Sequence, residues 1–148
     1  MKWTNDKSIK LSIILVFAFG IILLLLDIIA VELVRELTIS RGMERFFTLF
    51  LVSIYSGSIF GWICLYDLYR LLKNIKKEEI FTLDNISLLR AISWCCGAAC
   101  LLSLLSCLYY FPFFFIAICS GFMMLIVRIV KNIFQQAYQM KNDLDLTI

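Results

Sequence analysis

An uncharged run of 37 residues, Ala91–Val127, constrains the fold of this chain more than any other feature. One membrane crossing takes about 20 apolar residues, because the hydrocarbon core is about 30 Å thick and an α-helix rises about 1.5 Å per residue. The run is therefore long enough for two crossings. Pro112, the single proline of the chain, lies inside it. Proline lacks an amide donor and disfavours helix at the residue before it, so we predict a helical hairpin that turns in or near Tyr109–Phe113.

The rest of the chain fits a membrane protein. Of its 148 residues, 62% are hydrophobic and 17% are charged, and the mean hydropathy is +0.92. Soluble domains are nearer half apolar and a quarter charged. We expect an all-α polytopic protein of one domain, an up-down bundle with transmembrane helices at about 10–33, 46–66, 91–110 and 113–133. Residues 67–90 would form the longest polar loop, with an amphipathic helical pattern at its start, and the end, 141–148, would be frayed.

The lysines and arginines predict the orientation. Four crossings place the N-terminus, the 67–90 loop and the C-terminus on one side, together with eleven of the 14 basic residues. The other side holds Arg35, Arg41 and Arg45. This bias predicts a multi-pass protein of the cytoplasmic (inner) membrane with both termini in the cytoplasm.

Small residues suggest where helices pack closely. In the second predicted helix Ser53, Gly57 and Gly61 repeat at four-residue spacing, which gives one stripe. The third helix carries Ala99, Cys100 and Ser103 on a similar face. Small residues let membrane helices approach. The stripes therefore predict packing between the second and third helices, or alternatively a homodimer face or a substrate path.

Asp27 is the one carboxylate embedded in an apolar segment. An ionisable residue within a membrane span is a functional candidate by default. It lies four residues before Val31, so one interpretation is an interfacial residue, about a turn inside the outer boundary, that Arg41 or Arg45 can reach. The alternative is an intramembrane proton or ligand site.

A basic stripe follows the second predicted helix, at Arg70, Lys73, Lys76 and Lys77. Anionic lipid attracts such residues by about 1 kcal/mol each. The stripe therefore predicts a topology determinant and lipid contact, or alternatively a docking surface for a cytoplasmic partner.

No motif for chemistry is present. The chain has no histidine, and its six cysteines lie in apolar stretches without C-x-x-C spacing, so zinc and haem attachment have no support. Nucleophile-elbow, phosphate-loop and metalloprotease motifs are also missing. We expect no enzymatic activity and no cofactor. The net charge of +3 is too modest to indicate direct nucleic-acid binding.

Several segments resemble a known family. Two of them flank the polar segment, namely 65–75 at the end of the second predicted helix and Phe81–Asn85 before the third. The others are Leu88–Arg90, 133–137 and, at the C-terminal end, Asp145–Ile148. Together they resemble the bacterial family catalogued as domain of unknown function 2975. The resemblance implies a small four-helix membrane protein. Because such proteins are commonly encoded beside a small helix-turn-helix DNA-binding regulator, it also implies a membrane partner or antagonist of that regulator.

Three hypotheses for the function follow. The first is a non-enzymatic membrane protein that binds a cytoplasmic regulator through 67–90 and 133–148, with Phe81, Asn85, Asp145 and Thr147 joining the basic stripe as contact residues for the partner or for lipid. The second is a small transporter or immunity-type protein that uses Asp27. The third is a structural subunit that forms oligomers through Ser53, Gly57 and Gly61.

Overall fold

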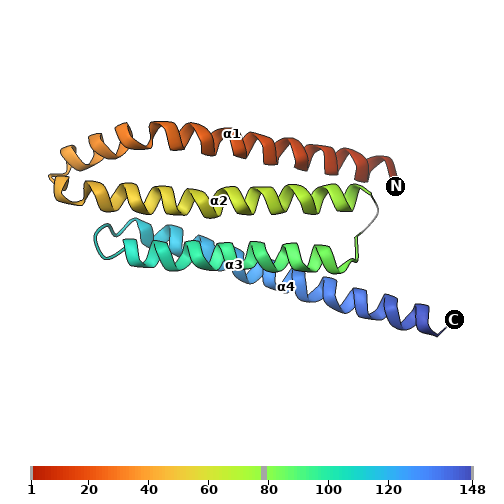
Figure 1. Cartoon of the computed structure of the whole chain (residues 1–148). Coiled ribbons are helices and arrows are strands. Elements are labelled where there is room, and N and C mark those ends of the chain that lie inside the picture. Colours follow the sequence, from red (N-terminus) through yellow and green to blue (C-terminus); the bar gives the residue numbers. More distant parts are fainter. Residues whose placement is uncertain (1, 78–79, 148) are drawn as a thin grey trace.

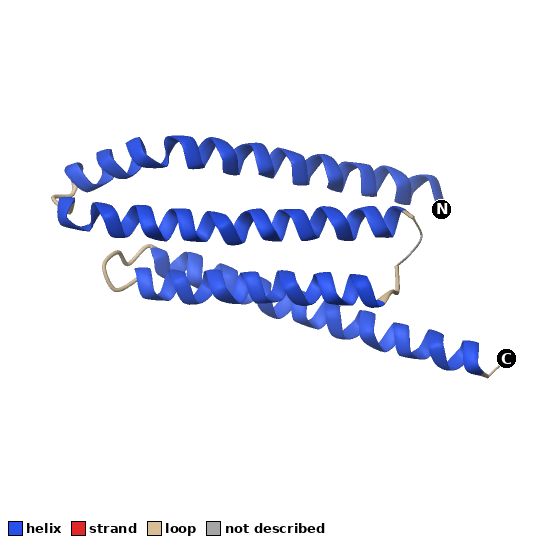
Figure 2. Ribbon diagram, in the orientation of Figure 1, coloured by secondary structure: helices blue, strands red, loops and turns tan. Residues whose placement is uncertain are grey.

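The computed structural model describes residues 2–77 and 80–147. Its elements are four long helices, α1 (Lys2–Ser40), α2 (Phe47–Lys76), α3 (Leu83–Ser106) and α4 (Phe113–Leu146), and one 3₁₀ turn, η1 (Glu44–Phe46). Short turns at 41–43 and 107–112 join α1 to η1 and α3 to α4 (Figure 2). Each long helix is long and apolar enough to cross a membrane. The predicted all-α fold with four membrane-spanning helices is thus confirmed.

The helices alternate in direction and pack in chain order (Figure 1). α2 packs on α1, α3 on α2, and α4 on α3, whereas α1 packs on α2 alone among the long helices in the described ranges. The bundle is therefore open on its α1 side. Both chain ends lie at the end that also holds the α2–α3 link (Figure 1). We call it the basic end, after the stripe at Arg70–Lys77, and the opposite end the hairpin end.

The helices are longer than the predicted spans. α2 continues ten residues past the expected end at residue 66, because residues 68, 71 and 75 keep an apolar face that packs inward. α1 runs to Ser40, with Arg35 and Glu32 paired at 3.5 Å one turn apart. α4 continues to Leu146, so the expectation of a frayed end from residue 141 is wrong. Within the expected 67–90 loop, α2 continues to Lys76, which agrees with the amphipathic pattern at its start, and α3 already begins at Leu83.

Both turns at the hairpin end have clear local causes. α1 ends at Ser40. Gly42, two residues later, has a φ of 65° that suits a residue without a β-carbon, and the Met43 amide donates to the Thr38 carbonyl at 2.8 Å. The chain therefore turns at Gly42 between α1 and η1. The α3–α4 turn lies at 107–112, and Pro112 caps α4. Proline suits a helix start because its missing amide proton is not needed there, so the predicted hairpin is confirmed.

The helices are tied together at both ends. At the basic end the buried Leu71, Leu88 and Leu89 form a core against which apolar residues of α4 pack, namely Val127, Val130 and Phe134. At the hairpin end Phe50 of α2, which is 3% exposed, meets the rings of Tyr109 and Tyr110 at centroid distances of 5.0 and 5.2 Å. α2, α3 and α4 thus form the packed part of the molecule.

Candidate functional site

Asp27 is held by side chains of α2. Its Oδ1 accepts a hydrogen bond from the Ser58 hydroxyl at 2.6 Å, and its Oδ2 accepts one from the Trp62 indole N–H at 3.1 Å. The Tyr55 hydroxyl donates to the Asp27 backbone carbonyl at 3.2 Å. Ser58 lies near the centre of the uncharged stretch 46–66 of α2. The carboxyl group therefore lies level with the middle of the uncharged stretch of α2, with one donor on each oxygen.

An apolar groove lies beside this carboxyl group, toward the basic end. It has a volume of about 470 Å³ and is formed between α1 and α2. Its lining is almost entirely apolar and aromatic, and includes Phe17, Gly20, Trp62, Tyr66 and Tyr69. Because Trp62 both lines the groove and donates to Asp27, it connects the two. The arrangement is a carboxyl group at one side of a space that could take an apolar molecule.

The partners of Asp27 differ from those expected. Arg41 lies over the Tyr110 ring at 5.5 Å and Arg45 over the Phe46 ring at 5.0 Å, both at the hairpin end. The expected pairing of Asp27 with Arg41 or Arg45 is therefore wrong. Sequence reasoning missed Ser58 and Trp62. Their four-residue spacing, which puts them on one face of α2, was the signal that could have found them.

The contact residues expected at the basic end divide into two groups. Arg70, Lys73, Lys76 and Lys77 are exposed, and so are Phe81, Asp145 and Thr147. Asn85 is 0% exposed, and it cannot contact a partner. Its side chain accepts from Asn74 Nδ2 at 2.8 Å and donates to the Ile80 carbonyl at 2.8 Å. Asn85 therefore holds the α2–α3 link, which corrects its assignment to a contact surface.

The end of α4 projects beyond the other helices. α3 and α4 are antiparallel, with Gly97 facing the Met124 sulfur and the Cys100 thiol donating to the Ala117 carbonyl at 3.3 Å. In this register Leu83, the first residue of α3, is level with about Tyr138. The later turns of α4 extend past α3 (Figure 1), and residues 139–147 are all exposed.

The projecting end has an apolar face. Met140 and Leu144 are 67% and 66% exposed and lie one turn apart. Together with Ile133 and Ala137, these two residues form a row with spacings of four, three and four residues, which we call the seam of α4. This is the spacing of the apolar residues along which two helices pack together. Such a seam normally faces a second helix.

The small-residue stripes are occupied within the chain. The Ser106 hydroxyl donates to Ser53 Oγ at 2.9 Å, and Gly57 faces Leu102, so both stripe residues lie against α3 as predicted. Gly61 instead faces Leu23 of α1. Cys100 faces α4, as the hydrogen bond to Ala117 requires, while Ser103 is buried and Ala99 is partly buried. No continuous stripe is left open along the described part of α2 and α3, which removes the structural basis for the oligomer face at these residues.

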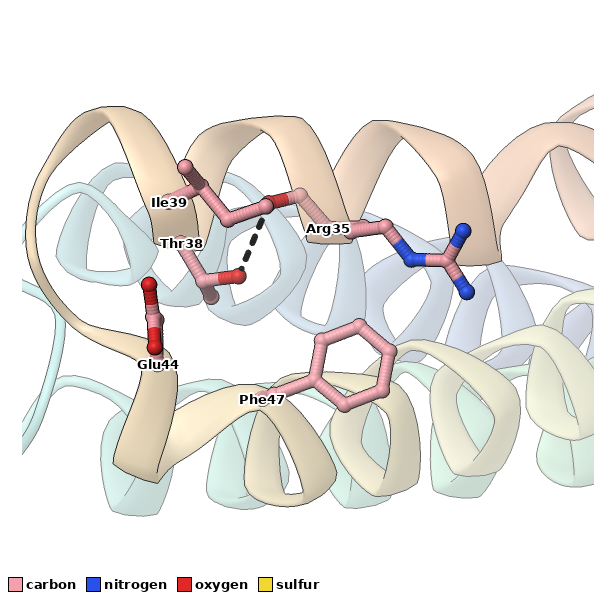
Figure 3. Close-up of a pocket in the computed structure, with 5 residues that line it drawn as sticks. All are labelled: Arg35, Thr38, Ile39, Glu44 and Phe47. Atoms are coloured by element: carbon pink, nitrogen blue, oxygen red, sulfur yellow. Dashed lines mark hydrogen bonds between the residues drawn. The ribbon is translucent and has the colours of Figure 1, made fainter.

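A second pocket lies at the hairpin end (Figure 3). It has a volume of about 360 Å³ and is lined by Arg35, Thr38, Ile39, Glu44 and Phe47. The Thr38 hydroxyl donates to the Arg35 carbonyl at 3.0 Å, and the Arg35 guanidinium points away from Glu44 (Figure 3). The charged groups do not converge on one point, so this pocket is a weaker candidate than the Asp27 site.

Comparison with known proteins gives a family but no characterised relative. The model of a family described as "Protein of unknown function (DUF2975)" matches residues 9–148, which confirms the resemblance found in the sequence. No curated protein and no solved structure matches the chain.

Proposed function

Since the chain belongs to the DUF2975 family, whose function is unknown, we propose from its own geometry that it is a non-enzymatic multi-pass membrane protein that binds a cytoplasmic protein through the projecting end of α4. The observation that carries the proposal is the exposed seam at Met140 and Leu144. Isolated short helices are marginal in water, so a helix end that packs on nothing gains most from a partner helix. Helix-on-helix docking of an apolar face is a common recognition mode.

The surroundings of this seam support a partner on the cytoplasmic side. The basic end carries the exposed Arg70, Lys73, Lys76 and Lys77, and cytoplasmic segments of membrane proteins are enriched in such residues. We propose a helix-turn-helix regulator encoded beside this protein as the partner. Such regulators are all-helical, so they have helix faces that can pack against the seam. The family resemblance implies that the gene for such a regulator lies beside the gene for this protein. Binding would hold the regulator at the membrane and away from DNA.

Placing charge in the seam should abolish this binding. In the variant Met140→Glu/Leu144→Glu, two carboxylates would have to be buried at the docked face, and we expect at least a tenfold loss of regulator co-purified from membranes. The matched control is Gln135→Glu/Asn142→Glu, which adds the same charge on the opposite face of the helix. A regulator that partitions identically with and without the membrane protein would rule the proposal out, as would equal retention by both variants.

A second candidate function is favoured by Asp27 and its groove. We propose, as the alternative, transport of an apolar cation through the membrane. An ionisable side chain deep in a span is costly and typically marks an ion or substrate path. The support is the carboxyl group with Ser58 and Trp62 on its two oxygens, next to a groove of about 470 Å³.

Asp27→Asn separates the two functions. It keeps a hydrogen-bond acceptor for one of the α2 donors but removes the ionisable group, so transport coupled to protons should fall to background. The measurement is efflux of ethidium, a lipophilic cation, from vesicles containing the protein under a pH gradient. Glu32→Gln, which removes an exposed carboxylate of the same helix, is the control. Equal efflux by the unmodified protein and the Asp27→Asn variant, or none by the unmodified protein, would contradict a transport role.

A further inference from the structure

A small basic pocket lies between α3 and α4 at the basic end. It has a volume of about 120 Å³ and is lined by Arg90, Ser93, Trp94, Met124, Arg128 and Lys131. Three of these six side chains are cations, and they come from two helices. The volume equals that of about four water molecules, which is enough for one phosphate group.

The helix register explains why the cations meet. Gly97 faces Met124, and continuing the antiparallel register brings Ser93 level with Arg128 and Arg90 level with Lys131. Arg128 and Lys131 are one turn apart on α4, so both lie on the same side of that helix. Among the side chains that the structure describes, the one ion pair is Arg35 with Glu32, so no described carboxylate neutralises the three cations.

The position of the pocket identifies its ligand. Arg90 directly precedes the uncharged run 91–127, and Arg128 directly follows it. The pocket therefore lies at the boundary of the apolar span, where lipid phosphates lie. Trp94 is 68% exposed, and tryptophan is enriched at this depth. Leu101 lies two turns farther along the same face of α3 and is 65% exposed, so an apolar surface continues from the pocket toward the membrane centre.

We infer that this pocket binds the phosphate of an anionic phospholipid, whose acyl chains lie over Trp94 and Leu101. Arg and Lys donate charge-assisted hydrogen bonds to phosphate oxygens, and the Ser93 hydroxyl adds a further donor. Basic pockets between membrane helices are a common form of headgroup site. This site is distinct from the exposed stripe at Arg70–Lys77, and it requires neither the regulator nor Asp27.

Native mass spectrometry of the full chain in detergent tests the inference. The probes are phosphatidylglycerol and phosphatidylcholine with identical acyl chains. We expect the protein to retain phosphatidylglycerol in preference to phosphatidylcholine. In Arg128→Gln/Lys131→Gln the retention should fall by about 10- to 30-fold, as the loss of two lipid-facing cations implies. The control Lys10→Gln/Lys141→Gln removes the same charge from exposed positions that belong to neither the pocket nor the stripe at Arg70–Lys77, and it should change retention less than about twofold.

Three results would overturn the inference. Equal retention of both lipids would mean that the headgroup charge is not recognised. An equal loss in both variants would mean a diffuse surface effect. Binding of inorganic phosphate alone, with displacement of the lipid at millimolar concentration, would make free phosphate the ligand. If the double variant does not fold, the single variant Arg128→Gln replaces it, and retention equal to that of the unmodified protein would also overturn the inference.

Discussion

Replacing Asn85 by alanine is expected to destabilise the protein by about 2 kcal/mol, because it removes a buried side chain together with its hydrogen bonds to partly buried groups. The Asn85 side chain is fully buried and joins Asn74 of α2 to the Ile80 carbonyl of the link. A lost hydrogen bond costs about 0.5–1.5 kcal/mol, and two such bonds are lost among the described partners of Asn85. Equilibrium unfolding followed by circular dichroism in detergent measures the change.

Ser87→Ala provides the matched control for this prediction. Ser87 is two residues farther along α3, is exposed, and donates to the Asp84 carbonyl at 2.8 Å. We expect a change below about 0.5 kcal/mol, as is usual at the surface. A double-mutant cycle with Asn74→Ala should also show coupling to Asn85, since the two amides share a hydrogen bond. Equal stability of the Asn85 and Ser87 variants would refute the structural role of Asn85.

Gly61→Leu is expected to cost about 3 kcal/mol by forcing α1 away from α2. A β-carbon added at Gly61 would already lie 3.2 Å from Leu23 Cδ2, so a leucine there must displace the Leu23 side chain of α1. α1 packs on no other long helix in the described ranges, so α3 and α4 cannot hold it in place. Unfolding by a denaturing detergent measures the loss. The Trp62 indole, in a chain with Trp3 and Trp94 replaced by phenylalanine, should also change its emission as its bond to Asp27 breaks.

The swap variant Leu23→Ala/Gly61→Leu tests the cause of this loss. It moves the bulk from one helix to the other and roughly conserves the volume, so it should recover at least about 1 kcal/mol of the loss. Additive losses from the two substitutions would mean that Leu23 and Gly61 do not share one contact. The loss at Gly61 would then need another explanation.

Much of the fold was predictable from local sequence features. The run Ala91–Val127 is too long for one crossing, and Pro112 can start a helix but cannot continue one, so a hairpin was required. The chain turns at Gly42 after α1 because glycine can adopt a positive φ. Helix lengths were underestimated at α1, α2 and α4, because hydropathy marks where a helix can meet lipid and not where its hydrogen bonds end.

The candidate sites were predictable only in part. Asp27 was identifiable from its apolar surroundings, whereas its partners on α2 depend on how far one helix is shifted along the other. The same shift decides that Gly61 faces α1 and Cys100 faces α4, although each belonged to a predicted α2–α3 stripe. Asn85 is a polar residue of a type usually found at the surface, and its burial and its bonds to Asn74 and the Ile80 carbonyl are seen only in the folded chain.

The sequence by itself determined the number of crossings, the positions of the turns and the placing of most positive charge at one end. These properties follow from the hydrophobic length, from the backbone chemistry of proline and glycine, and from the order of charges along the chain. The tertiary structure alone decided which residues meet. It sets Ser58 and Trp62 on Asp27, Arg90 beside Arg128 and Lys131, and the seam of α4 beyond the start of α3. The reason is physical, because contacts between helices depend on the rotation and the register of each helix, and side-chain packing across the whole bundle fixes both.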